Sequence, residues 1–188
     1  MSKRLFIGVP IQSDKATKQS IIWKNDRQLN NNQLNWTKPE NWHITLFFLG
    51  DTPISKIALL QNLIEESFKH IGAFNTELIG LGVFPNTHNP KVLWLGLEDI
   101  QPLMPAYYQL GDLLLQNGFS FDSKPLKPHL TLARIKHLND RQGFETLLKD
   151  YQQFSFGSVK IDRVVLYESI LTQQGPVYKS LFEKLLIR

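Results

Sequence analysis

The chain has 188 residues, of which 42% are hydrophobic and 20% charged, so it can bury a sizeable core and is not intrinsically disordered. It contains no cysteine, which excludes disulfides, cysteine–zinc sites and cysteine nucleophiles, and its formal net charge of +4 mildly favours an anionic partner. No apolar run is long enough to span a membrane or to serve as a signal peptide, so we expect a cytoplasmic protein with no membrane partner.

The first part of the chain alternates between apolar runs typical of strands and segments with helical periodicity. Ser13-Asp14 is a plausible cap for a helix that runs to about Gln28. Thr52-Pro53 has the form of a helix cap followed by proline, and apolar residues within 57–71 then recur at helical spacing. The segments expected to be extended are 4–9, 34–37, 42–49, 74–84 and 91–97.

The second part of the chain repeats this order of elements. We expect a helix over 102–117, ended by Gly118, and a shorter helix capped by Asn139 or Asp140. The order strand, helix, strand, helix, strand thus occurs twice. The strands expected in this part are 92–97, 127–135, 154–170 and 178–187.

Two copies of one tetrapeptide lie at matching places in the two parts: His43-Ile44-Thr45-Leu46 and His129-Leu130-Thr131-Leu132. In a strand, residues i and i+2 point to the same face, so each copy places an imidazole beside a hydroxyl. Two such surfaces facing each other would offer two proton-transfer groups and two neutral hydrogen-bond donors to one substrate. This pattern predicts acid–base chemistry on a phosphate.

The repeated order of elements predicts an α+β fold. We expect two similar lobes of mainly antiparallel sheet with helices on the outer faces, each lobe contributing one His-x-Thr strand to a central cleft. No segment is long enough to act as a linker between independent units. We therefore expect a single domain over 1–188 made of two similar lobes.

A lone histidine in a strand is more often structural than catalytic, but its repetition at matching positions argues against that interpretation. His70, His88 and His137 are expected to be exposed to solvent. The chain has no phosphate-binding glycine-rich loop and no metalloprotease or nucleophile-elbow motif. Threonine is a poor ligand for divalent metals, so we expect no metal, although a two-histidine metal site stays open.

Beyond the two tetrapeptides, the sequence resembles the two-histidine (2H) phosphoesterase superfamily, and most of all its RNA 2′,3′-cyclic phosphodiesterases, also called 2′-5′ RNA ligases. The resemblance covers nearly the whole chain. The segments that carry it are 4–7, 35–37, 39–46, 48–50, 82–85, 92–96, 128–134, 166–169, 175 and 178.

The resemblance implies a bilobal fold with pseudo-two-fold symmetry and a metal-independent enzyme. Its substrate would be the 2′,3′-cyclic phosphate at an RNA 3′ end and its product a 2′-phosphomonoester; some members also join RNA ends in vitro. The implied catalytic set is His43, Thr45, His129 and Thr131, with Arg134 as a substrate contact. His129 would be the base and His43 the acid. No cofactor is implied, because the strained ring drives its own opening, and we expect a monomer.

The sequence leaves the roles of two residues near the motifs open. Arg134 lies three residues after Thr131, so in an unbroken strand it would point away from His129. It can reach the cleft only through a bulge or a strand end, and otherwise it is a solvated surface residue. A second hypothesis is that Phe47, next to the first motif, stacks on a base.

The substrate also has alternatives. It could be a small cyclic nucleotide, or another phosphodiester such as ADP-ribose 1″,2″-cyclic phosphate or a 2′-5′ oligoadenylate. The chain could instead be an RNA-end-binding protein without turnover, although binding alone would not require both proton-transfer groups.

Overall fold

The computed structural model describes residues 1–188 with the exception of 27–28, 30–31, 123 and 174. The α-helices of the described residues are α1 (Asp14–Asn25), α3 (Ile57–Phe68), α4 (Met104–Gln116) and α5 (Arg141–Asp150). The strands are β1 (Ser2–Pro10), β2 (Gln33–Trp36), β3 (His43–Pro53), β4 (Phe74–Phe84), β5 (Val92–Leu97), β6 (His129–His137), β7 (Ser155–Ile161), β8 (Arg163–Thr172) and β9 (Gly175–Leu185).

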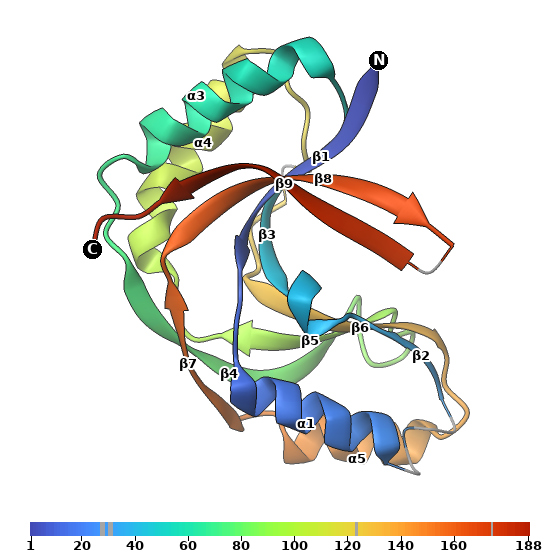
Figure 1. Ribbon diagram of the computed structural model, residues 1–188. Coiled ribbons are helices and arrows are strands. Elements are labelled where there is room, and N and C mark those ends of the chain that lie inside the picture. The colour runs from blue at the N-terminus through green and yellow to red at the C-terminus, as the bar shows by residue number, and fades with distance from the viewer. Residues whose placement is uncertain (27–28, 30–31, 123, 174) are drawn as a thin grey trace.

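The strands form one curled sheet in the order β7-β4-β5-β6-β3-β1-β8-β9, and β2 pairs with β6 beside this path. Neighbouring strands are antiparallel throughout. Helices α3 and α4 lie together at one end of the molecule, and α1 and α5 lie together at the other (Figure 1). The predicted α+β fold with a duplicated antiparallel architecture is therefore confirmed.

Each half of this sheet takes elements from both halves of the sequence. The first lobe contains β3, β1, β8 and β9, so two early strands are joined to the last two strands of the chain. The second lobe contains β6, β5, β4 and β7, and its strand β4 comes from the first part of the sequence. The lobes are thus interleaved along the chain, and they are joined into one sheet where β3 pairs with β6.

The expected strand 154–170 is two strands, because the chain crosses from one lobe to the other within it. Strand β7 pairs with β4 in the second lobe, whereas β8 pairs with β1 in the first lobe. The break falls at Asp162, between the two strands. Periodicity alone does not reveal such a crossing, since both strands carry similar apolar residues.

The helix caps are partly as expected. Ser13 accepts a hydrogen bond from the amide of Ala16 at 3.2 Å, and Asp140 accepts one from the amide of Gly143 at 2.9 Å, so both predicted caps are confirmed. The predicted end of the first helix, Gln28, lies outside the described residues.

The predicted cap at Thr52 is wrong. Thr52 belongs to β3 and pairs with Lys3 of β1, so the first residues of the chain extend this strand through Pro53. Helix α3 begins only at Ile57, after a 3₁₀ turn over Ile54–Lys56, and it has no side-chain cap. The helical spacing of its buried residues is as predicted.

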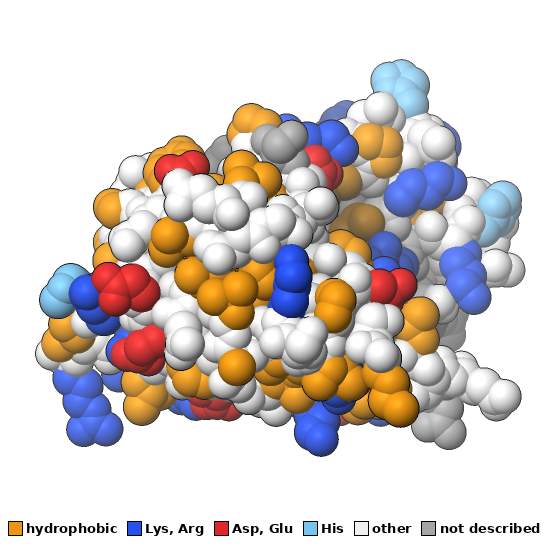
Figure 2. Space-filling model, turned by 90° about the horizontal axis from the view of Figure 1, so that it is seen from above, with side chains coloured by type: hydrophobic (Ala, Val, Ile, Leu, Met, Phe, Trp, Pro, Cys, Tyr) orange, Lys and Arg blue, Asp and Glu red, His pale blue; other side chains and the backbone are white. Residues whose placement is uncertain are grey.

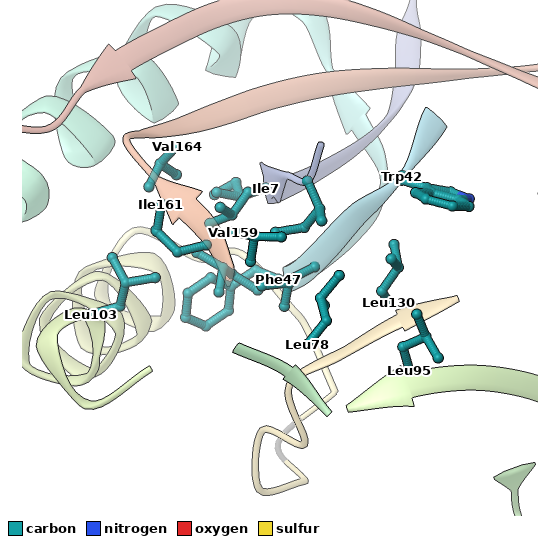
Figure 3. Close-up of a cluster of buried hydrophobic side chains, with 14 of the residues drawn as sticks. Ile7, Trp42, Phe47, Leu78, Leu95, Leu103, Leu130, Val159, Ile161 and Val164 are labelled. Carbon is teal, nitrogen blue, oxygen red and sulfur yellow. The ribbon is translucent and has the colours of Figure 1, made fainter. Parts of the chain in front are cut away.

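The core lies between the sheet and its helices and takes side chains from both lobes (Figure 3). Ile44, Leu46, Leu130 and Leu132 from the two motifs are all buried in it. Phe47 is only 2% exposed and stacks on Tyr107 of α4 with ring centroids 4.6 Å apart. The hypothesis that Phe47 stacks on a nucleobase is therefore wrong, since its ring is part of the core.

No helix in the described part of the chain is long and apolar enough to cross a membrane.

Candidate active site

Both His-x-Thr motifs meet where β3 and β6 pair. Ile44 lies opposite Leu130 in this antiparallel ladder. Antiparallel strands run in opposite directions from this pair, so His43 lies on the side of Thr131 and Thr45 on the side of His129. All four side chains are half-buried, whereas the residues between them are buried in the core. The structure thus brings the four predicted residues to one face of the sheet, with each histidine across from the other motif's threonine.

Each imidazole is held by the same local hydrogen bond. The Nδ1 atom of His43 lies 2.7 Å from the backbone oxygen of Asn41, and that of His129 lies 2.7 Å from the oxygen of Lys127. A carbonyl oxygen can only accept, so Nδ1 carries a proton in both rings. When the ring is neutral, its Nε2 atom is then left as a proton acceptor. Both histidines are thereby prepared for acid–base work through Nε2.

Aromatic side chains surround both rings. His43 contacts Phe6 at a centroid distance of 4.7 Å and the edge of Tyr178 at 5.1 Å, while Phe84 packs edge-on against His129 at 4.9 Å. Burial lowers the pKa of both histidines below the ordinary value of 6.5, against the backbone hydrogen bonds that raise it. Repulsion from His129 lowers the pKa of His43 further. The pair therefore resists carrying two protons at once.

The two threonine hydroxyls are available to a ligand. Among the described residues, neither the Thr45 nor the Thr131 hydroxyl has a hydrogen-bond partner within the protein. A half-buried hydroxyl in that state is a neutral donor ready for an anionic oxygen.

A bulge in β6 brings Arg134 to the same face. Trp94 of β5 pairs with Thr131, but the preceding Leu93 pairs with Ala133, so Leu132 is an extra residue in the ladder. The alternation of side chains shifts by one position, and Arg134 and Lys136 both line the cavity. The bulge that a substrate contact by Arg134 required is therefore present.

Strand β3 carries an equivalent bulge after its own motif. Gly8 of β1 pairs with Thr45 and Ile7 pairs with Phe47, so Leu46 is the extra residue. As a result Phe48, and not Phe47, lies on the cavity face. Sequence reasoning missed Phe48. The sequence does contain a signal for Phe48, since it lies five residues after His43 just as Arg134 lies five residues after His129.

A cavity of about 1370 Å³ opens over this face. Its wall includes His43, Thr45 and Thr131, while His129 shares the strand face of Thr131 without being part of the wall. Pockets for small-molecule ligands measure about 300–1,000 Å³, so this cavity is larger than a typical small-molecule site. The charged residues of the wall are Arg4, Lys38, Arg134 and Lys136 against the single acid Glu40.

This gathering of cations is local. Figure 2 shows lysine and arginine side chains spread among acidic and hydrophobic ones over the face seen from above. Lys124, which precedes the second motif and is not part of the cavity wall, is exposed and paired with Asp122 at 3.1 Å. The net charge of the chain indicates an anionic partner only in general, whereas the cations on the cavity wall indicate that a negatively charged ligand binds in this cavity.

The remaining histidines His70, His88 and His137 are exposed, as expected. Within the residues that the structure describes, no group of three or more histidines and carboxylates is placed to hold a metal ion.

The chain is similar to several known proteins. The family model of the AKAP7 2′5′ RNA ligase-like domain matches residues 5–183. The RNA 2′,3′-cyclic phosphodiesterase of Thermotoga maritima is 37% identical over 79% of this chain and 77% of its own length. The enzyme of that name from Archaeoglobus fulgidus is 32% identical over 95% of this chain and 97% of its own length.

Two solved structures share the fold. The protein TT0787 of Thermus thermophilus superposes with a TM-score of 0.77 at 26% identity, covering 97% of both chains. Escherichia coli LigT complexed with 3′-AMP superposes with a TM-score of 0.74 at 22% identity, covering 100% of both chains.

Proposed function

Because this chain belongs to the 2′-5′ RNA ligase-like family of 2H phosphoesterases, we propose that it hydrolyses 2′,3′-cyclic phosphates at RNA 3′ ends and leaves a 2′-phosphomonoester. The observation that carries the proposal is that two Nδ1-anchored histidines and two threonine hydroxyls, which have no partner among the described residues, share the sheet face over which the cavity opens. Such a set supplies a base, an acid and neutral donors around one phosphorus atom.

In the proposed mechanism, Nε2 of His129 takes a proton from water as the water oxygen attacks phosphorus. The bond from phosphorus to the 3′ oxygen breaks, and Nε2 of His43 gives that oxygen a proton. Nucleophile and leaving group lie in line on opposite sides of phosphorus, which suits two histidines from two lobes. The hydroxyls of Thr45 and Thr131 donate to the non-bridging oxygens, and Arg134 balances their charge.

The coupling of the two rings supports a division into one base and one acid. Repulsion between them disfavours the doubly protonated pair, so a cleft that holds one proton contains one base and one acid. If a 5′-hydroxyl of a second RNA replaced water as the nucleophile, the same proton transfers would form a 2′-5′ linkage. Ligation in vitro is therefore a side reaction of this mechanism.

Turnover assays on matched substrates test the proposal. We expect the protein, in excess EDTA, to open a 2′,3′-cyclic-phosphate-ended oligonucleotide faster than a small cyclic nucleotide, ADP-ribose 1″,2″-cyclic phosphate or a 2′-5′ oligoadenylate. The product should carry a 2′-phosphate. Preference for a small substrate would move the function to that compound, and tight RNA binding without turnover would make the chain an end-binding protein. Loss of activity in EDTA, restored by one metal ion, would refute the metal-free mechanism.

The pH dependence of the reaction follows from the lowered pKa values of the two histidines. One ring must be neutral and the other protonated, so kcat/KM should be bell-shaped with pH. Because burial lowers both pKa values in the free protein, the acid loses its proton below the ordinary value of 6.5. We expect the maximum of kcat/KM below pH 6.5. A maximum well above that pH, or a flat profile between about pH 5 and 8, would contradict the assignment.

A further inference from the structure

The cavity extends well beyond the four motif residues. It follows β6 from the pairing with β3 at Leu130 toward the other end of the strand, where β2 lies beside β6 (Figure 1). Its wall includes Thr131 at the reaction centre and still includes Lys136, five residues further along the strand. Five residues of strand span roughly 15 Å, which is more than the reacting phosphate alone requires. The outer part of the cavity is therefore available to another part of the ligand.

Two cations face this outer part from one side of β6. Arg134 and Lys136 are both exposed on the cavity wall, whereas Ile135 between them is only 6% exposed and belongs to the core. Residues two positions apart on a strand are about 7 Å apart. Arg134 lies nearer to the motif, so Lys136 presents a second positive charge one step further from the reaction centre.

The charge of Lys136 is not neutralised within the described part of the chain. Lys136 has no ion-pair partner there, and neither has Arg134. The one carboxylate among the described wall residues is Glu40, which is exposed and comes from the 3₁₀ turn that precedes β3. Two like charges at this spacing repel each other, and a ligand with two negative charges in succession relieves that repulsion. The pair thus favours a ligand that carries two anionic groups in a row.

We propose that Lys136 binds the phosphodiester on the 5′ side of the terminal nucleotide while the cyclic phosphate reacts at the motifs. The inference rests on the proposed function, since it takes the ligand to be an RNA end. An RNA strand supplies two anions in succession, because one ribose separates each phosphate from the next. The body of the RNA then leaves the cleft over β2 and the end of β6. This subsite recognises charge and not the identity of the base, and a single cyclic nucleotide does not reach it.

The test uses two dinucleotides that end in a 2′,3′-cyclic phosphate and carry a 2′-O-methyl group on the first ribose. One has a natural phosphodiester linkage, and the other has a methylphosphonate of nearly the same shape and no charge. The measured quantity is the ratio of their kcat/KM values, charged over neutral. We expect a ratio of about 5 in the wild type, the effect of one exposed ion pair, and of about 1 in Lys136→Gln. Lys136→Arg keeps the cation and should keep the ratio.

Lys160→Gln is the matched control. Lys160 is an exposed lysine on β7, at the far edge of the same lobe, and it is not part of the cavity wall. Its substitution removes the same charge and should leave the ratio at the wild-type value. The proposal is overturned if the wild type does not distinguish the two linkages, if Lys136→Gln keeps the ratio, or if Lys160→Gln lowers it equally.

A failure of the proposed function gives a different result. If the wild-type protein opens neither dinucleotide, the proposed function fails, and equilibrium binding of adenosine 2′,5′-bisphosphate and adenosine 2′-phosphate decides the subsite. Only the bisphosphate carries an anion on the 5′ side. Lys136→Gln should then weaken binding of the bisphosphate by about 5-fold and leave binding of the monophosphate unchanged. Equal weakening of both compounds, or no binding of either, would overturn the subsite.

Discussion

Substituting alanine for either His43 or His129 is expected to lower kcat/KM for a cyclic-phosphate-ended oligonucleotide by about 10²–10⁴-fold, which is the contribution of one proton-transfer group. The two rings lie on one face across paired strands and are anchored identically through Nδ1. In-line displacement needs a base on one side of phosphorus and an acid on the other, so neither ring can replace the other. The double variant should lose little more than the worse single variant, because the two histidines act as one unit. Steady-state kinetics of the three variants checks this.

Substituting alanine for His88, which is exposed, provides the control and should leave kcat/KM within about two-fold of the wild-type value. Thermal unfolding of each variant shows whether the half-buried rings of His43 and His129 also support the fold. If both single variants retained near-wild-type turnover, the cleft face would not be the reaction site.

A change of leaving group separates the two roles. A 3′-deoxynucleoside 2′-(4-nitrophenyl) phosphate releases nitrophenolate, which needs no proton from an acid. If His43 is the acid, His43→Ala should recover most of its activity on this compound while His129→Ala stays impaired. The reverse pattern would exchange the roles of base and acid, and equal impairment would refute a separate acid.

The sequence predicts the functional face of this protein well because that face depends on strand periodicity. His43 and Thr45, and likewise His129 and Thr131, share a face through the two-residue repeat of a strand, and the buried residues between them confirm it. The caps at Ser13 and Asp140 are local and equally readable. These features involve only residues a few positions apart.

What the sequence does not reveal depends on which strands are neighbours. The bulges at Leu46 and Leu132 are defined by the registers of β1 and β5 against the motif strands. Without those registers Phe47 appears as the aromatic residue nearest the motif, whereas the bulge turns it into the core and turns Phe48 outward. The placement of β4 in the second lobe, and of β8 and β9 in the first, likewise depends on tertiary pairing.

Removal of one threonine hydroxyl is expected to lower kcat by about 10²–10³-fold, as is typical for one donor to a charged transition state. Valine has the shape of threonine and suits a strand, so Thr45→Val and Thr131→Val should fold as the wild type does. KM should change little, because donation to the non-bridging oxygens strengthens as charge develops on them. Measurement of kcat and KM for both variants, with unfolding temperatures, checks these expectations.

Serine provides the matched comparison at both positions, since it keeps the hydroxyl and loses only the methyl group. Thr45→Ser and Thr131→Ser should retain most of the turnover that the valine variants lose. Because each hydroxyl is set across from the other motif's histidine, loss of either one removes a donor beside one ring and leaves the other donor in place. Similar losses in the two valine variants would therefore mean that both lobes hold the phosphate in the transition state. Valine variants with near-wild-type kcat, or serine variants as impaired as valine, would show that the hydroxyls do not donate there.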